Sequence, residues 1–195
     1  MNRTSWLILV FALGCLSNAI VLAQSQPIFL RLKGLGVGDI PTPGAIATDL
    51  KMAGGYAYLT WLNNTDSNHL GGLEIYQVTN PSAPVRVGSL ETRRHANSLC
   101  VVGDYAYLAL GTAQTLTNDP GSIEIVDVRD PANPAILGGV GSLGRALGVR
   151  VLNNYAYVAV SSHWTGSNLL GRLEVFDVST QIIPHRLPRS ILPDR

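Results

Sequence analysis

The chain has 195 residues, of which 46% are hydrophobic and 14% are charged, and its formal net charge is +1. This composition is too apolar for a disordered chain, and the length is sufficient for one domain with its own core. A net charge this small provides no basic surface for nucleic acid, so we expect no nucleic-acid partner. The 20 glycines and 11 prolines are typical of a protein with many turns.

Residues 1–23 are predicted to form a signal peptide. Arg3 supplies a positive charge, an apolar run follows over residues 6–13, and Val21 and Ala23 place small or apolar residues at the cleavage positions. We therefore expect export with cleavage after Ala23. The mature protein would then be secreted, periplasmic or attached to the cell surface.

Two alternatives remain open for this segment. A membrane anchor would need an uninterrupted apolar run, whereas Gly14 and Ser17 interrupt this one. A lipoprotein would be attached through Cys15, but the leucine before it stands one position too late for a good lipidation motif. Once the segment is removed, Cys100 has no cysteine partner in the chain, and we interpret it as a small hydrophobic core residue.

Residues 24–195 are predicted to contain repeats of about 50 residues. The tripeptide Tyr-Ala-Tyr begins at positions 56, 105 and 155. A hexapeptide with glutamate in second place begins at positions 73, 123 and 173, and a proline-rich turn follows it at 80–84 and 130–134. Because all three marks keep one register, we divide the chain into units at about 46–95, 96–145 and 146–195.

Each unit is predicted to contain four short strands. The first lies near 50–52, 99–102 or 149–152, and a tight turn of Gly, Asn or Asp residues joins it to the Tyr-Ala-Tyr strand. A long polar loop leads to the hexapeptide strand, and the proline-rich turn leads to the fourth strand. Residues 27–32 resemble an isolated fourth strand, of the outer type.

Four strands in a unit of this length are typical of a propeller blade. The segment Ile123–Pro134, which reads Ile-Glu-Ile-Val-Asp-Val-Arg-Asp-Pro-Ala-Asn-Pro, resembles the LVIVD repeat of bacterial and archaeal surface or secreted proteins. The resemblance covers about residues 45–178 and implies a β-propeller with no established general activity. Two features depart from the family: glutamate occupies a position that is usually apolar, and the preceding loop is longer.

The fold class expected is therefore all-β, with about three blades of four antiparallel strands. Closed propellers typically have at least four blades, so we expect an open or partial propeller. Open blade faces and strand edges are adhesive, which makes self-association through these faces possible.

The sequence contains no recognisable catalytic or cofactor-binding constellation. Residues 139–144 match G-x-G-x-x-G but precede a strand instead of a helix, so a phosphate-binding loop is not expected. The four histidines lack metal-ligand spacing and are interpreted as solvated loop residues. Glu74, Glu124 and Glu174 occupy equivalent positions, so we expect similar environments and a structural role for all three. The second tyrosine of each Tyr-Ala-Tyr tripeptide, at positions 58, 107 and 157, is expected to pack between blades.

Strand alternation places the long loop between the second and third strands beside the connection from one unit to the next. Binding residues often lie on such loops over a rigid scaffold. The polar and aromatic side chains on this predicted rim are Asn64, Asp66, His69, Arg93, Arg94, His95, Asp119, Arg145, His163 and Trp164.

The sequence favours a non-catalytic extracytoplasmic binding or scaffold module, with a protein or glycan at the cell surface as partner. No cofactor and no metal are expected. The alternatives are a propeller-based enzyme, either a hydrolase or a quinone-cofactor oxidoreductase, and a truncated fragment without independent function.

Overall fold

The computed structural model describes residues 43–65, 68–112, 121–162, 171–179 and 185–186. The predicted signal peptide and the strand expected at 27–32 lie outside these residues. All described residues belong to the unit Leu32–Arg195. They form twelve strands: β1 (Ala45–Ala53), β2 (Tyr56–Asn63), β3 (Gly71–Gln77), β4 (Val85–Thr92), β5 (Ala96–Val102), β6 (Tyr105–Leu110), β7 (Ser122–Asp127), β8 (Ala135–Gly141), β9 (Gly144–Leu152), β10 (Tyr155–Ser162), β11 (Gly171–Asp177) and β12 (His185–Arg186).

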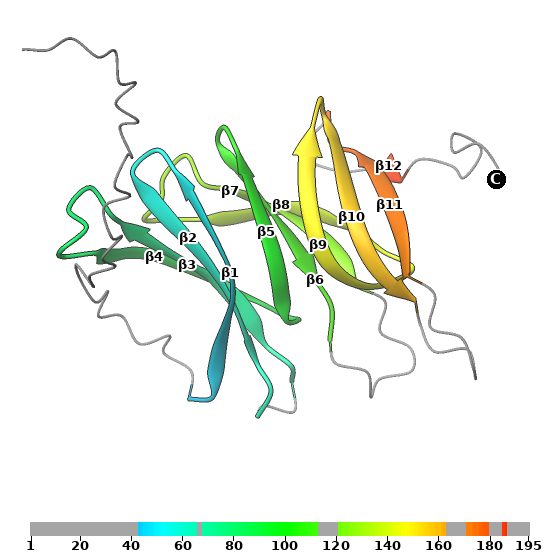
Figure 1. Ribbon diagram of the computed structural model, residues 1–195, viewed down its shortest axis with the longest axis horizontal. Helices are drawn as coiled ribbons and strands as arrows, with labels where there is room; N and C mark the ends of the chain where they lie inside the picture. Colours follow the sequence, from blue (N-terminus) through cyan, green and yellow to red (C-terminus); the bar gives the residue numbers. More distant parts are fainter. Residues whose placement is uncertain (1–42, 66–67, 113–120, 163–170, 180–184, 187–195) are drawn as a thin grey trace, which may run out of the picture. The chain divides into compact units, whose positions relative to one another are not determined.

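The strands form three antiparallel sheets of four, each made from strands consecutive in the chain: β1–β4, β5–β8 and β9–β12. This confirms the predicted all-β fold of propeller-type blades. The first strands β1, β5 and β9 lie side by side, with β5 between the other two (Figure 1). No helix within the described part of the chain is long and apolar enough to cross a membrane.

The turns between the first and second strands of each sheet have the left-handed backbone that the sequence indicates. Gly54 and Gly55 have φ values of 57° and 81°, Gly103 has 57°, and Asn153 and Asn154 have 49° and 66°. Glycine and asparagine tolerate this region best, and it suits the right-handed twist of a hairpin. The turn before the fourth strand is supported by a local side chain, because Asp127 Oδ1 accepts a hydrogen bond from the amide of Arg129 at 3.0 Å. Asp177 Oδ1 does the same for the amide of Ser179 at 2.8 Å.

Each first strand bends at a β-bulge, and in two sheets the bulged residue reaches the next sheet. Thr48 Oγ1 donates to the carbonyl oxygen of Ala96 at 2.5 Å, and Asn97 Nδ2 donates to the carbonyl oxygen of Ala146 at 2.8 Å. The equivalent residue in the third sheet is Leu147, which is exposed. Polar side chains therefore join the first strands of successive sheets.

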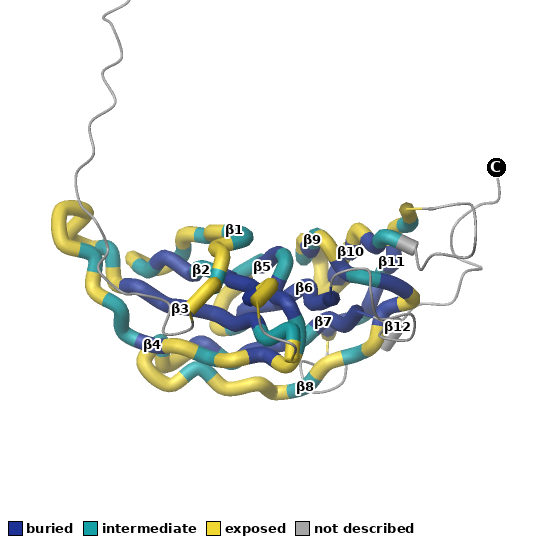
Figure 2. Tube along the Cα trace, turned by 90° about the horizontal axis from the view of Figure 1, so that it is seen from below, coloured by how far each residue is buried: buried dark blue, intermediate teal, exposed yellow. Residues whose placement is uncertain are grey.

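Two hydrophobic cores hold the sheets together. The first lies between sheets β1–β4 and β5–β8, where Tyr58, Leu73 and Ile75 pack against Leu99 and Leu108. Because β6 and β7 contribute residues to both cores, they are almost fully buried, whereas β8 is mostly exposed (Figure 2).

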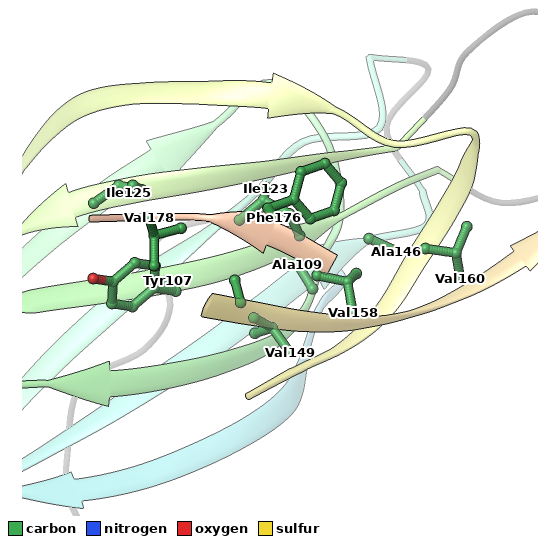
Figure 3. Packing of buried hydrophobic residues seen from close by; sticks show 11 residues of the cluster. Tyr107, Ala109, Ile123, Ile125, Ala146, Val149, Val158, Val160, Phe176 and Val178 are labelled. Atoms are coloured by element: carbon green, nitrogen blue, oxygen red, sulfur yellow. The ribbon is translucent and has the colours of Figure 1, made fainter. Parts of the chain in front are cut away.

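The second core lies between sheets β5–β8 and β9–β12. Phe176 is fully buried there among Ile123, Ala146 and Val158, and Tyr107 and Val149 extend the cluster (Figure 3). Cys100 is half-buried at its edge, so the prediction of a packed hydrophobic residue is correct although its burial is partial.

Candidate functional site

The two kinds of long connection lie on the same side of the sheets, as strand alternation predicts. The amide of Gly121, at the end of the β6–β7 loop, donates to the carbonyl oxygen of Gly144 at 2.9 Å. The amide of Ser142, in the β8–β9 connection, donates to the carbonyl oxygen of Gly121 at 2.8 Å. We call this side the long-loop rim.

Six of the ten residues proposed for this rim lie among the described residues. Asp66, Asp119, His163 and Trp164 lie outside them. The described six differ in accessibility: Asn64 and Arg93 are exposed, His69, Arg94 and Arg145 are half-buried, and His95 is fully buried. Only some of the proposed side chains can therefore meet a partner directly.

His95 is not a solvated loop histidine, and that prediction is wrong for it. Its Nε2 lies 3.0 Å from the carbonyl oxygen of Asn63, so Nε2 carries the proton and donates. The ring meets His69 edge to face, with centroids 5.3 Å apart. Burial lowers the pKa of His95, and the nearby His69 and Arg145 lower it further. A neutral His95 thus links the end of β2 to the start of β5.

Arg145 also joins sheets. Its Nη2 donates to Asn97 Oδ1 at 3.0 Å, and Asn97 in turn holds the carbonyl oxygen of Ala146. Its Nε is buried without a hydrogen-bond partner, and burial lowers the pKa of the guanidinium. These contacts place Arg145 in the packing between β5 and β9.

The three repeat-equivalent glutamates occupy three different environments, contrary to the similar ones expected from repeat symmetry. Glu74 is buried and forms an ion pair with Arg86 of β4. Glu174 is buried and accepts the amide of Leu143, at 3.2 and 3.3 Å from its two oxygens. Glu124 is half-buried, and its Oε2 is enclosed without a hydrogen-bond partner. Neighbouring residues that are not repeated, such as Arg86, cause the difference.

Glu124 lines a crevice of about 350 Å³ on the sheet β5–β8. Ser122 also lines it, and its buried Oγ lacks a hydrogen-bond partner as well. The full lining consists of Arg94, Gly121, Ser122, Glu124, Ile136, Gly138, Gly139, Val140 and Gly141. Unsatisfied polar atoms are costly in a buried position, and two of them belong to residues that line this one crevice.

Gly139 is required for the shape of the crevice. It pairs with Glu124 across β7 and β8. A Cβ at this position would lie 2.6 Å from the carbonyl oxygen of Ile123 and 3.1 Å from Cγ of Glu124. Any larger residue at position 139 would displace Glu124. The position of the Glu124 carboxylate therefore depends on Gly139 of β8.

The charge of Glu124 is set by two opposing effects. Burial raises the pKa of its carboxyl, and the positive charges of Arg94 and Arg93 lower it. Arg94 also lines the crevice. The crevice therefore offers carboxylate and hydroxyl acceptors beside a cation, bordered by Ile136, which is a suitable surface for a small polar group.

The sequence contained two features of this site, but both were interpreted in another way. The segment 139–144, which contains Gly139 and Gly141, matched a phosphate-binding pattern and failed its context. Glu124 was interpreted as structural together with its two equivalents. Ser122 carried no signal. Within the ranges that the structure describes, no three His, Cys, Asp or Glu side chains are grouped so that they could hold a metal ion.

The three sheets and their repeated register define a repeat protein built from propeller-type blades. A family model of the LVIVD repeat matches residues 44–92, 93–141 and 143–163, which is more than half of the chain. The chain therefore belongs to the LVIVD repeat family. No match was found among curated proteins.

Proposed function

We propose that this protein is an extracytoplasmic, non-catalytic binding module whose ligand site is the crevice at Glu124. One observation carries the proposal: Glu124, alone among three repeat-equivalent glutamates, has an enclosed oxygen without a hydrogen-bond partner and lines an open crevice. A carboxylate that serves only the fold is expected to resemble Glu74 and Glu174, which have partners. The extracytoplasmic location rests on the signal-peptide pattern of residues 1–23.

The chemistry of the crevice supports a ligand that donates hydrogen bonds. Glu124 Oε2 and Ser122 Oγ would accept from hydroxyl or amine groups. A volume of about 350 Å³ lies at the lower end of the range for small-molecule sites. It suits one sugar ring of a surface glycan or one polar side chain of a surface protein.

The proposal is tested by binding of the purified protein to a glycan array and to a panel of cell-surface proteins. Glu124→Gln keeps the shape of the side chain but removes its charge, and we expect binding to fall about tenfold or more, since hydrogen bonds to charged groups contribute about 1.5–3 kcal/mol. Glu91→Gln is the matched control, because Glu91 is an exposed carboxylate on β4. Equal binding by the wild-type protein and Glu124→Gln would show that the crevice is not the ligand site.

A further inference from the structure

One side of the sheet β9–β12 is a largely apolar surface that no described strand covers, and Arg150, which pairs with Tyr157, is a charged residue on the same side. From Tyr155 to Val160 of β10, residues alternate between exposed and buried. The exposed side includes Tyr157, which is 36% exposed, and it continues on β11 with Leu173, which is 53% exposed. Tyr157 and Ala159 pair directly with Val175 and Leu173, so all four share one face of the sheet. We call Tyr155, Tyr157, Ala159, Leu173 and Val175 the open face.

The open face has the sequence of a junction between blades. Its residues are the repeat equivalents of Tyr105, Tyr107, Ala109, Ile123 and Ile125 in the preceding sheet, all of which belong to the core between β5–β8 and β9–β12 or pack against it. Tyr107 is 3% exposed and Ile123 is 0% exposed, because Phe176 and Val158 cover them. The protein thus contains a template for what fits this face, namely the opposite face of another blade.

The first sheet presents residues of that opposite kind. Leu50 and Met52 of β1 are 52% and 62% exposed. The repeat equivalents of Leu50 are Leu99 and Val149, which are 0% and 1% exposed because each fills a junction with the sheet before it. One chain therefore carries both halves of a blade junction, each with exposed apolar side chains.

We propose that the open face binds the β1 side of a second copy of this chain, in a head-to-tail contact. Leu173 and Tyr157 of one copy would pack against Leu50 and Met52 of the other, as Ile123 and Tyr107 pack in the sheet β5–β8. The bulge residue at this junction is the exposed Leu147, where the other two sheets have Thr48 and Asn97. At the bulge position the new contact is therefore more apolar than those within the chain, which suits association of separate molecules, and Arg150 stands where the second sheet has Cys100.

The experiment is sedimentation velocity on the purified protein at about 100 µM, a concentration that populates contacts of micromolar affinity. We expect the wild-type protein to associate. Leu173→Arg and, separately, Leu50→Arg should both give monomers. Val85→Arg is the matched control, because Val85 is 54% exposed on β4 and belongs to neither surface, and it should associate as the wild type does.

A mixture of the two defective variants separates head-to-tail pairing from pairing of like faces. The Leu50→Arg copy retains an intact open face, and the Leu173→Arg copy retains an intact β1 side, so an equimolar mixture should form a dimer through one contact. A monomeric wild-type protein, association that survives Leu173→Arg, or a mixture that stays monomeric would each overturn the proposal. Circular dichroism of each variant verifies that it is folded.

Discussion

The second and third sheets carry nearly the same residues on corresponding faces, yet one face is core and the other is surface. Ile123 and Tyr107 are fully or almost fully buried, whereas their equivalents Leu173 and Tyr157 are 53% and 36% exposed. The strands that bear them have the same pairing partners and nearly the same register. The difference comes entirely from the neighbour: sheet β9–β12 covers the first pair, and no described strand covers the second.

This comparison shows that a repeat specifies a blade but not what its residues contribute to stability. Burial of apolar area is the dominant favourable contribution, and it depends on contacts outside the repeat. The same reasoning applies to polar positions, because Glu74, Glu124 and Glu174 are equivalent in sequence and have different partners. Matched substitutions at equivalent positions can measure these differences.

The largest expected effect is at the covered and open aliphatic positions. Ile123→Ala should lower the free energy of unfolding by about 2–5 kcal/mol, because it leaves a cavity in a closed core. Leu173→Ala should change it by less than about 1 kcal/mol, since Leu173 is 53% exposed. Urea denaturation at low protein concentration measures both without interference from association. Equal losses for the two variants would mean that the open face is covered in solution.

A smaller effect is expected at the glutamates. Glu74→Gln should lower the free energy of unfolding by about 1–3 kcal/mol, because it removes the buried partner of Arg86. Glu124→Gln should leave stability unchanged or raise it, because burial raises the pKa of this carboxyl and so disfavours its charged form, and its Oε2 has no hydrogen-bond partner to lose. Thermal melts of the two variants at neutral pH provide the measurement. A loss at Glu124 as large as that at Glu74 would indicate a structural role for both.

The smallest effect concerns pH. The folded-state pKa of His95 lies below its ordinary value of 6.5, so below about pH 6.5 the unfolded chain binds a proton that the folded chain does not. Stability should therefore be constant above that pH with respect to this group and should fall by up to about 1.4 kcal/mol per pH unit below it, until the folded-state pKa is reached. His95→Gln retains a donor for the carbonyl oxygen of Asn63 and should flatten this part of the profile. The same slope in both proteins between pH 5 and 6.5 would contradict the assignment.

Several features of the fold followed directly from local sequence. Gly54, Gly103 and Asn153 mark hairpin turns because few residues tolerate positive φ. Asp127 and Asp177 support the next turn through hydrogen bonds that span only two residues. Tyr58 and Tyr107 pack between sheets as expected, because each faces a neighbouring sheet. The same expectation is wrong for Tyr157, which is 36% exposed because no described strand covers its face.

The candidate site was harder to predict from local sequence. The polar long-loop rim was predicted correctly as a topological feature, since alternation of strands determines which connections share a side. The crevice was not predicted, because it depends on the close approach of Glu124 and Gly139 across two strands. The sequence also did not show that Glu124 would lack an ion-pair partner of the kind that Arg86 provides for Glu74. His95 was predicted to be solvated. That prediction was wrong because its contact with Asn63 joins residues far apart in the chain, which local sequence does not reveal.

The sequence by itself determined the repeat, the four strands of each unit and the turns that join them, because these depend on side-chain periodicity and on backbone preferences within a few residues. Only the tertiary structure decided which equivalent residues are buried, which glutamate lacks a partner and which sheet face stays open. Those outcomes depend on packing between units and on desolvation by residues distant in sequence. A sequence pattern that repeats about every 50 residues does not specify the packing between units or this desolvation.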